Sequence, residues 1–524
     1  MLKRIIGFVL IAAFSTLVSY GVNLQFLHLA ERSAIDQKLM VFFLACALTY
    51  ILFMLWVDGV KLQWKWNLPR VTTALFIDNL PGIALAILFV LAYLRFAVTF
   101  NNFGVGQVDN LFDADVGSWM RRISSDDVRD FEMRGPHPFT YFIFRPFGMT
   151  LNLFTQDPTF SAILFNVLTG GMCVFLMWLL VKRKFGSKVY AFLMASLLGV
   201  SASHFALGSI IETYIYSALA LVLFCLLVMD EKSSLPSLVG VGVVTFGITL
   251  TNFIQNLLAF IVSRPRWREI IRFAGWTMAV SLLLTYLHAY IYPASKLFFL
   301  VPDVQNEDKF FLDIFLQKDW MIQGRILYLI RTLVFYSMIA PKVFILTEEV
   351  GSTIPEFRFY KISVGTFHQT DYVGMGQILI IVWALMLAVS GLVFLWRLLR
   401  ERKVELPLAL VLSLLFNFVI HVNYGQELFL YSPDWMYALV LFAAYGLSPF
   451  AKNRVFQAGL LVFILLLTYN QWQFMSIVLN TLETYASTSP AGGSAWNARP
   501  AYRKLQFAAR TALCDSPQTQ SNSP

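Results

Sequence analysis

The chain has 524 residues, of which 58% are hydrophobic and only 14% are charged, and it carries a formal net charge of +9. Soluble domains contain about 25% charged residues, so this composition excludes an ordinary soluble protein. The net charge does not point to nucleic acid, because the basic residues lie at the ends of apolar runs, where membrane orientation places them. The apolar runs are roughly 18 to 25 residues long, which is the length of a transmembrane helix. The sequence therefore predicts an all-α polytopic membrane protein.

About thirteen membrane-spanning helices are expected from these runs and their flanking charges. The predicted spans are residues 5–27, 39–58, 74–98, 158–181, 189–207, 210–229, 271–291, 376–397, 405–423, 434–450 and 455–475, together with two short helices between 235 and 263. The two short helices are predicted to meet at the polar elbow "TLTNFIQN". The first run has a basic start and no clear small-residue cleavage site, which favours a retained span over a cleaved signal peptide.

The spans divide the chain into five parts. The parts are two additional N-terminal helices (1–73), a transmembrane core with the loop 99–157 (74–291), an external or re-entrant segment (292–375), C-terminal transmembrane helices (376–475) and an external tail (476–524). Within 292–375 an apolar run is interrupted by Arg331 and ends at Pro341. A surface-lying or re-entrant helix fits that run better than a clean span.

The basic residues predict the orientation. If the N-terminus is cytoplasmic, the inner connections comprise 48 residues and hold 20 of the 40 Lys and Arg residues. This asymmetry follows the positive-inside rule. It places the loop 99–157, the segment 292–375 and the tail outside the cytoplasm, so any chemistry is expected at the external face.

Acidic residues are concentrated in the loop 99–157. The acids are Asp109, Asp113, Asp115, Asp126, Asp127, Asp130, Glu132 and Asp157. Asp113 and Asp115 lie in "NLFDADVGSW", where bracketing apolar residues would hold them against the bilayer surface. A carboxylate there can act as a general base or help to bind a divalent cation, although D-x-D pairs also arise by chance. The acids at 126–130 are as well explained by helix capping.

A His-Pro element follows in "RGPHPFTYFIFRPFG". Pro136 and Pro138 fix the backbone around His137, which either contacts a substrate or binds neighbouring backbone groups. Arg145 in the same stretch is a candidate ligand for a phosphate group.

Other polar residues are predicted near the external ends of spans. A carboxylate near a membrane interface such as Glu212 is a functional candidate, with simple exposure to water at a helix start as the alternative. The candidate phosphate-binding cations of 292–375 are Lys296, Lys309, Arg325, Arg331, Lys342, Arg358 and Lys361. Arg331 is the foremost of these because it interrupts an apolar run, although snorkelling to the headgroups is an equal alternative. Glu427, Tyr431 and Asp434 are candidates for sugar contact, because aromatic rings stack on sugar faces and carboxylates accept hydrogen bonds from sugar hydroxyls. Interfacial tyrosines are, however, common in membrane proteins.

These motifs resemble those of the GT-C glycosyltransferases, the polytopic enzymes that include protein O-mannosyltransferases and the aminoarabinose transferase of lipid A. His137-Pro138 resembles the family's "HPPL"-like element, from which Phe139 and Thr140 depart. "LGSIIETYIYSALAL" resembles a second external acidic motif, and "GITLTNFIQNLLAF" resembles the paired half-helices of the superfamily. The acidic loop follows the first span in those families but the third span here.

The resemblance implies an inverting transfer of a sugar from a polyprenyl-phosphate donor to a glycan, lipid or protein acceptor in a bacterial inner or plasma membrane. Asp113 would be the base, and Asp115 would support it or hold a divalent cation. A divalent cation is the possible cofactor of this reaction. Asp109 is an alternative for the first role, or a substrate contact. No P-loop motif is evident. The alternatives are a transporter or flippase, which would carry charges within its spans, and a polymerase or ligase of lipid-linked glycans.

Overall fold

The computed structural model describes residues 2–26, 34–58, 73–102, 111–125, 128, 132–305, 307–346, 355–401 and 404–488. The α-helices of the first half are α1 (Leu2–Phe26), α2 (Ala34–Asp58), α3 (Thr73–Asn102), α4 (Val116–Ser124), α5 (Thr140–Thr155), α6 (Pro158–Phe185), α7 (Lys188–Val200), α8 (Ala202–Leu207), α9 (Thr213–Val228), α10 (Leu235–Ile248) and α11 (Phe253–Ser263). Those of the second half are α12 (Trp267–Ile291), α13 (Val301–Gln305), α14 (Asp319–Arg331), α15 (Met375–Arg400), α16 (Glu405–Asn423), α17 (Pro433–Gly446) and α18 (Arg454–Thr488).

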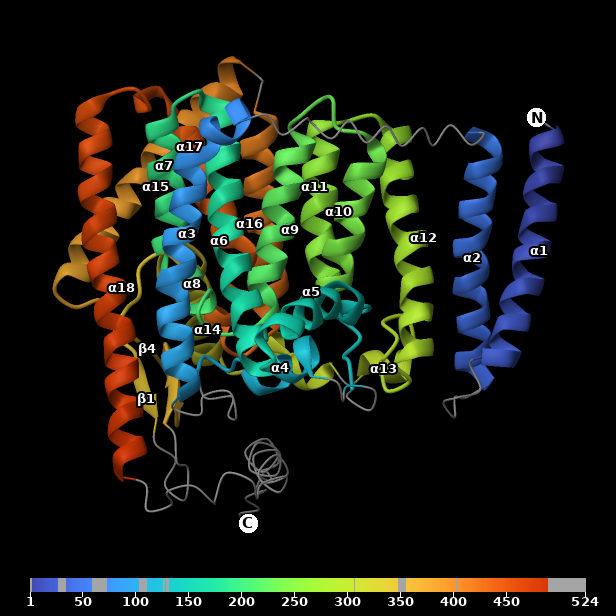
Figure 1. Ribbon diagram of the computed structural model, residues 1–524, viewed down its shortest axis with the longest axis horizontal. Helices are drawn as coiled ribbons and strands as arrows, with labels where there is room; N and C mark the ends of the chain where they lie inside the picture. The colour runs from blue at the N-terminus through green and yellow to red at the C-terminus, as the bar shows by residue number, and fades with distance from the viewer. Residues whose placement is uncertain are drawn as a thin grey trace, which may run out of the picture.

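Eight helices in the described part of the chain are long and apolar enough to cross a membrane: α1, α2, α3, α6, α12, α15, α16 and α18. The shorter helices α7, α9, α10, α11 and α17 also lie in predicted spans. In the ribbon the long helices run side by side (Figure 1). The protein is therefore an all-α membrane protein, as the composition predicts.

The helix connections alternate between two ends of the bundle. The α6–α7, α9–α10, α11–α12, α15–α16 and α17–α18 connections lie at the same end as the N-terminus (Figure 1). The opposite end, called the loop end here, carries α4, α5, α13, α14 and all four strands. The candidate residues of the long loops therefore gather at one end of the molecule.

Local sequence signals set the ends of α6. Asp157 is the N-cap, and its carboxylate accepts hydrogen bonds from the amides of Thr159 (2.9 Å) and Phe160 (3.1 Å). Pro158 occupies the first turn, where its missing N–H costs nothing. Gly186 ends the helix at φ +70°, a conformation that glycine adopts without strain. The charge run Lys182 to Lys184 lies in the last turn, where cations oppose the helix dipole.

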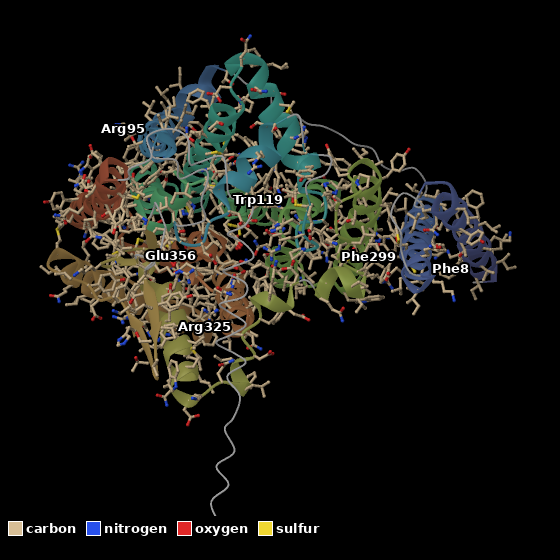
Figure 2. All side chains as sticks on the ribbon, turned by 90° about the horizontal axis from the view of Figure 1, so that it is seen from below. Phe8, Arg95, Trp119, Phe299, Arg325 and Glu356 are labelled. Atoms are coloured by element: carbon tan, nitrogen blue, oxygen red, sulfur yellow. The ribbon has the colours of Figure 1, made fainter. Side chains whose placement is uncertain are left out.

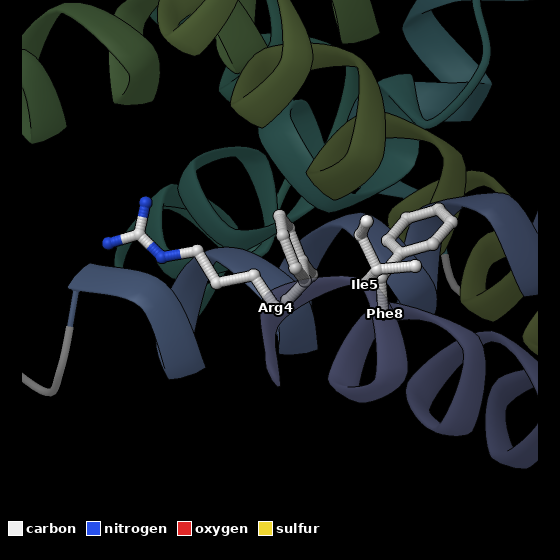
Figure 3. Close-up of a pocket in the computed structure, with 4 residues that line it drawn as sticks. Arg4, Ile5 and Phe8 are labelled. Atoms are coloured by element: carbon white, nitrogen blue, oxygen red, sulfur yellow. The ribbon is translucent and has the colours of Figure 1, made fainter. Parts of the chain in front are cut away.

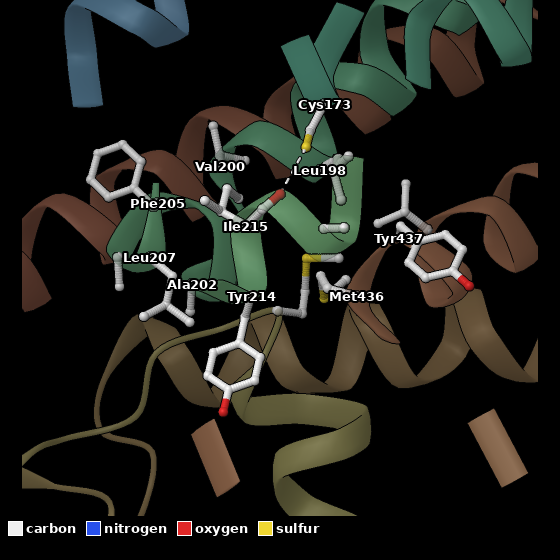
Figure 4. Close-up of a cluster of buried hydrophobic side chains, with 14 of the residues drawn as sticks. Cys173, Leu198, Val200, Ala202, Phe205, Leu207, Tyr214, Ile215, Met436 and Tyr437 are labelled. Carbon is white, nitrogen blue, oxygen red and sulfur yellow. Dashed lines mark hydrogen bonds between the residues drawn. The ribbon is translucent and has the colours of Figure 1, made fainter. Parts of the chain in front are cut away.

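The centre of the bundle is formed by α6, α7, α9 and α17. Figure 4 shows apolar side chains from α7, α8, α9 and α17 packed together, with the Cys173 thiol directed at the Ile215 carbonyl 3.6 Å away. By contrast, α1 and α2 lie at the edge, and α2 packs on α12. Contacts there include the Tyr286 hydroxyl on the Met40 carbonyl and the Phe43 ring 4.8 Å from that of Phe299.

The predicted polar elbow is a break between two short helices. A single turn of 3-10 helix, Leu250–Asn252, joins α10 to α11. The Leu250 amide donates to the Pro136 carbonyl (2.9 Å), and the Thr140 hydroxyl donates to the Gly247 carbonyl (3.0 Å). The start of α5 thus satisfies backbone groups that the break would otherwise leave without partners.

The segment 292–375 differs in detail from the expectation of one surface-lying or re-entrant helix. Its main helix, α14, has 13 residues and is about 20 Å long, less than the roughly 30 Å hydrocarbon core. A π-helical turn (Thr332–Tyr336) follows it. Two antiparallel two-stranded sheets come next, β1 (Phe344–Leu346) with β2 (Glu356–Arg358) and β3 (Tyr360–Ser363) with β4 (Thr366–Gln369).

Two further features of the chain were not expected. The β3–β4 hairpin turns at Val364-Gly365, where Gly365 has φ +77°. A glycine between two short runs of alternating residues is a weak local signal for such a turn. The last helix, α18, continues to Thr488, so the first residues of the predicted tail 476–524 are helical.

Candidate functional site

A tight turn at the loop end presents Asp113. The Ala114 amide donates to the Leu111 carbonyl (3.1 Å), and both central residues have positive φ, +54° at Phe112 and +62° at Asp113. Gly, Asn and Asp usually occupy such positions, so Phe112 is the unusual residue of the turn. The Phe112 amide donates to the Phe357 carbonyl (3.1 Å), which attaches the turn to β2.

Arg358, at the end of β2, faces the Asp113 carboxylate. One guanidinium nitrogen lies 3.8 Å from Asp113 Oδ1, and the same group pairs with Glu356. Another nitrogen donates to the Tyr360 hydroxyl (3.0 Å). Because the side chain of Arg358 is only 11% exposed and that of Asp113 is 33% exposed, the carboxylate is the more open member of the pair.

Glu212 lies beneath Asp115. Its carboxylate accepts the Asp115 amide (2.9 Å) and caps α9 by accepting the Thr213 amide (2.8 Å). The side chain is buried, so it does not simply face water at a helix start.

Glu427 is a second buried acid at this end. It accepts hydrogen bonds from the Tyr328 hydroxyl and from the Phe429 amide (3.1 Å). Burial raises the pKa of Glu427 to about 7, while the Tyr328 hydrogen bond and the charge of Arg358 act in the opposite direction. Asp113 is also close enough to raise that pKa. The name polar cluster is used below for Asp113, Glu212, Glu356, Arg358 and Glu427.

Aromatic rings border the polar cluster. The ring of Tyr431 lies 4.9 Å from that of Tyr214 and 4.5 Å from that of His421. In Figure 4 the Tyr214 ring points away from the apolar core of the bundle. Asp434 is buried in the first turn of α17, beside Asn252 of the elbow. The sugar-contact candidates Glu427, Tyr431 and Asp434 therefore lie between the loop end and the break in α10–α11.

Two arginines hold the surrounding loops together. Arg134 pairs with Glu307, and the Tyr424 hydroxyl donates to Glu307 Oε2 (3.3 Å). Arg325 is buried and donates to four carbonyl groups at the end of α16: those of His421 (2.8 Å), Tyr424 (3.1 Å), Gly425 (2.6 Å) and Gln426 (3.1 Å). Sequence reasoning missed Glu307 and Tyr328, because their partners Arg134 and Glu427 are far away in the chain. It also missed Glu356, although its partner Arg358 is only two residues away.

His137 occupies a structural position. Its Nδ1 lies 2.6 Å from the carbonyl oxygen of Ile248, the last residue of α10. Burial lowers the pKa of His137 to about 3, and Arg134 adds to this effect. A neutral ring that donates to the end of a half-helix matches the backbone-binding alternative for this residue.

Of the remaining candidates, Arg145 and Arg331 bind groups outside the polar cluster. Arg145 donates to the Ser125 carbonyl (2.7 Å), at the end of α4. Arg331 pairs with Asp371 (3.0 Å) and donates to Gln369 (3.3 Å). The side chain of Lys342 is exposed. Asp109, Asp126, Asp127 and Asp130 lie outside the described residues.

A cation site is not evident in the part of the chain that the structure describes, where no three His, Cys, Asp or Glu side chains gather. Binding of a divalent cation by Asp113 and Asp115 stays a prediction.

A surface depression lined by Arg4, Ile5, Phe8 and Phe53 lies on α1 and α2 (Figure 3). Viewed from the loop end, Phe8 lies far from Glu356 and Arg325 (Figure 2).

Comparison with known proteins adds no relative. No protein-family model matches the chain, and no curated protein matches it significantly. The fold and the loop end define the class of this protein. It is an all-α membrane protein with charged and aromatic side chains gathered at one end of its helix bundle.

Proposed function

We propose that this protein is a membrane glycosyltransferase of the GT-C type. In this proposal it moves a sugar from a polyprenyl-phosphate donor to a glycan, lipid or protein acceptor, with inversion at the anomeric carbon. The observation that carries the proposal is the polar cluster, in which the partly open Asp113 carboxylate lies 3.8 Å from the guanidinium of Arg358. A carboxylate beside a guanidinium supports the proposal, because the acceptor needs a base and the phosphate leaving group needs a cation.

Each member of the polar cluster has a chemical role in this reaction. Asp113 takes the proton from the acceptor nucleophile as its bond to the anomeric carbon forms. The bond from that carbon to the phosphate oxygen breaks, and the leaving phosphate needs a cation. Arg358 is proposed for this role in place of Arg331 because its guanidinium lies 3.8 Å from Asp113, although it also pairs with Glu356.

The two buried acids are proposed as substrate contacts. The Oε2 atom of Glu427 has no hydrogen-bond partner among the described residues, and burial raises the pKa of this carboxyl to about 7. A protonated carboxyl group can donate a hydrogen bond to a sugar hydroxyl or a phosphate oxygen. Glu212 is proposed as the second contact because it lies beside the backbone of Asp115.

The proposal also includes the topology. The charge asymmetry supports thirteen crossings with a cytoplasmic N-terminus and the loop end outside. In a bacterial inner or plasma membrane that end faces the acceptors of the cell envelope. The helices α1 and α2 are then an addition at the edge of a GT-C-like core, since they pack only along its side.

Substitution of Asp113 tests the proposal. We expect Asp113→Asn to lower transfer from radiolabelled polyprenyl-phosphate sugars in membranes by about 100-fold or more, because a base is lost while the shape is kept. Glu132→Gln is the matched control, since Glu132 is an exposed acid of the same loop. Full activity of Asp113→Asn at normal expression would refute the assigned base.

A further inference from the structure

The turn that carries Asp113 is held in an unfavourable backbone conformation. Phe112 and Asp113 both have positive φ, at +54° and +62°. Aspartate adopts this conformation fairly readily, but phenylalanine does not. A bulky residue at positive φ is a genuine outlier among L-residues. Such outliers persist only where the surroundings fix them, and they cluster at functional sites.

The surroundings that fix this turn are aromatic. Phe112 is 1% exposed. Its ring lies 5.0 Å from Phe359, 5.0 Å from Phe429 and 5.9 Å from Phe474. These three rings come from the segment after β2, from the turn that follows Glu427 and from α18. One side chain thus joins the turn to three separate parts of the chain.

The same residue aligns Asp113 with its cation. The Phe112 amide donates to the carbonyl of Phe357, the residue before Arg358. A shift of the turn along β2 would therefore change the distance from Asp113 to Arg358. It would also move the Asp115 amide away from Glu212, to which it now donates at 2.9 Å.

We propose that Phe112 is a positioning residue, whose buried ring holds the strained turn and aims the Asp113 carboxylate at the polar cluster. This inference rests on the proposed function for its effect on turnover. A buried phenylalanine that served only the hydrophobic core would not need positive φ, since the other rings of this cage have ordinary backbone angles. The strain at Phe112 is instead the consequence of placing the next residue, Asp113, beside Arg358 with its carboxylate partly exposed.

Replacement of Phe112 by glycine tests the role of the ring separately from the strain of the backbone. Phe112→Gly adopts positive φ without strain but removes the ring, and Phe112→Leu retains apolar volume. Kinetics are measured on the full-length protein in membranes with a polyprenyl-phosphate sugar, beside Asp113→Asn. Exchange of the Ala114 amide, which closes the turn, is followed by hydrogen–deuterium exchange in detergent.

We expect Phe112→Gly to lower kcat by about 10- to 100-fold, the cost of a displacement of about 1 Å at a catalytic group, with KM nearly unchanged. The Ala114 amide loses protection in this variant, and Phe112→Leu recovers most of both properties. Phe260→Ala is the control, because Phe260 is a buried ring stacked on Phe273 at 4.4 Å, in a helix that ends at the opposite end of the bundle. It should lower thermal stability and leave kcat unchanged.

The possible failures are distinguishable. Wild-type kcat in Phe112→Gly, with Asp113→Asn inactive, overturns the positioning role and leaves the proposed function standing. Full activity of Asp113→Asn overturns the proposed base, and amide exchange then decides the role of Phe112 alone. Retained protection of Ala114 in Phe112→Gly overturns that role.

Discussion

At the scale of single residues, the buried acids give the protein a dependence on pH that an ordinary surface carboxylate would not. The pKa of Glu427 rises from 4.5 to about 7 because the folded protein removes it from water. Between these two values the unfolded chain has released its proton while the folded protein still holds it. Stability therefore falls as the pH rises through this window, and above the folded pKa the loss is constant.

Glu427→Gln tests this reasoning. A shift of this size corresponds to about 3 kcal/mol, and glutamine has no charge to bury. We expect the loss of thermal stability between pH 5 and pH 8 to become smaller in Glu427→Gln. Melting curves in detergent across this range provide the measurement. An unchanged pH dependence would show that Glu427 is ionised in the folded protein at all these pH values.

At the scale of elements, the C-terminal end of α16 depends on a cation from α14. Arg325 is 2% exposed, and it donates to carbonyl groups that helix geometry leaves without partners. The loop that it holds leads directly to Glu427 and Tyr431. The positions of Glu427 and Tyr431 therefore depend on a buried arginine that lies about 100 residues earlier in the chain.

Arg325→Met should be strongly destabilising. Removal of the guanidinium leaves several buried carbonyl groups unsatisfied, at about 1–3 kcal/mol each, so we expect a loss of at least about 3 kcal/mol. Arg331→Met is the control, because its partner Asp371 is 83% exposed and exposed pairs contribute about 1 kcal/mol or less. Thermal unfolding of the two variants gives the comparison. Equal losses would contradict the structural role of Arg325.

The sequence predicts helices better than it predicts the site, for a physical reason. Helices follow from local apolar runs, so a helix lies at each predicted span, and the elbow between α10 and α11 is where the polar residues indicate. The pairing of Arg358 with Asp113 depends on strands that meet through tertiary contacts. A local run does not report such pairing, and Arg331 was preferred only because it interrupts an apolar stretch.

At the scale of the whole molecule, the two ends of the bundle differ in what they carry. Basic connections such as Lys182 to Lys184 lie at the end of the N-terminus, and the polar cluster lies at the other. The positive-inside rule assigns these ends to the cytoplasm and to the exterior. If this orientation is correct, the polar cluster faces the exterior, and a test of the orientation also tests the location of the site.

Labelling of single cysteines checks the orientation. In a variant whose four cysteines are replaced, Val364→Cys lies at the exposed tip of the β3–β4 hairpin and Lys184→Cys lies at the opposite end. We expect a membrane-impermeant maleimide to label Val364→Cys in intact cells and to label Lys184→Cys only after lysis. The reverse pattern would place the polar cluster in the cytoplasm.

The proposed function requires that the polar cluster break the bond between a sugar and a polyprenyl phosphate, with Asp113 as the base. The most direct measurement follows a doubly labelled polyprenyl-phosphate sugar in proteoliposomes that contain the purified protein and a membrane extract as a source of acceptor. We expect release of free polyprenyl phosphate and transfer of the sugar, both lost in Asp113→Asn and retained in Glu132→Gln. Movement of the intact labelled lipid across the bilayer, without cleavage, would contradict it and identify a flippase instead.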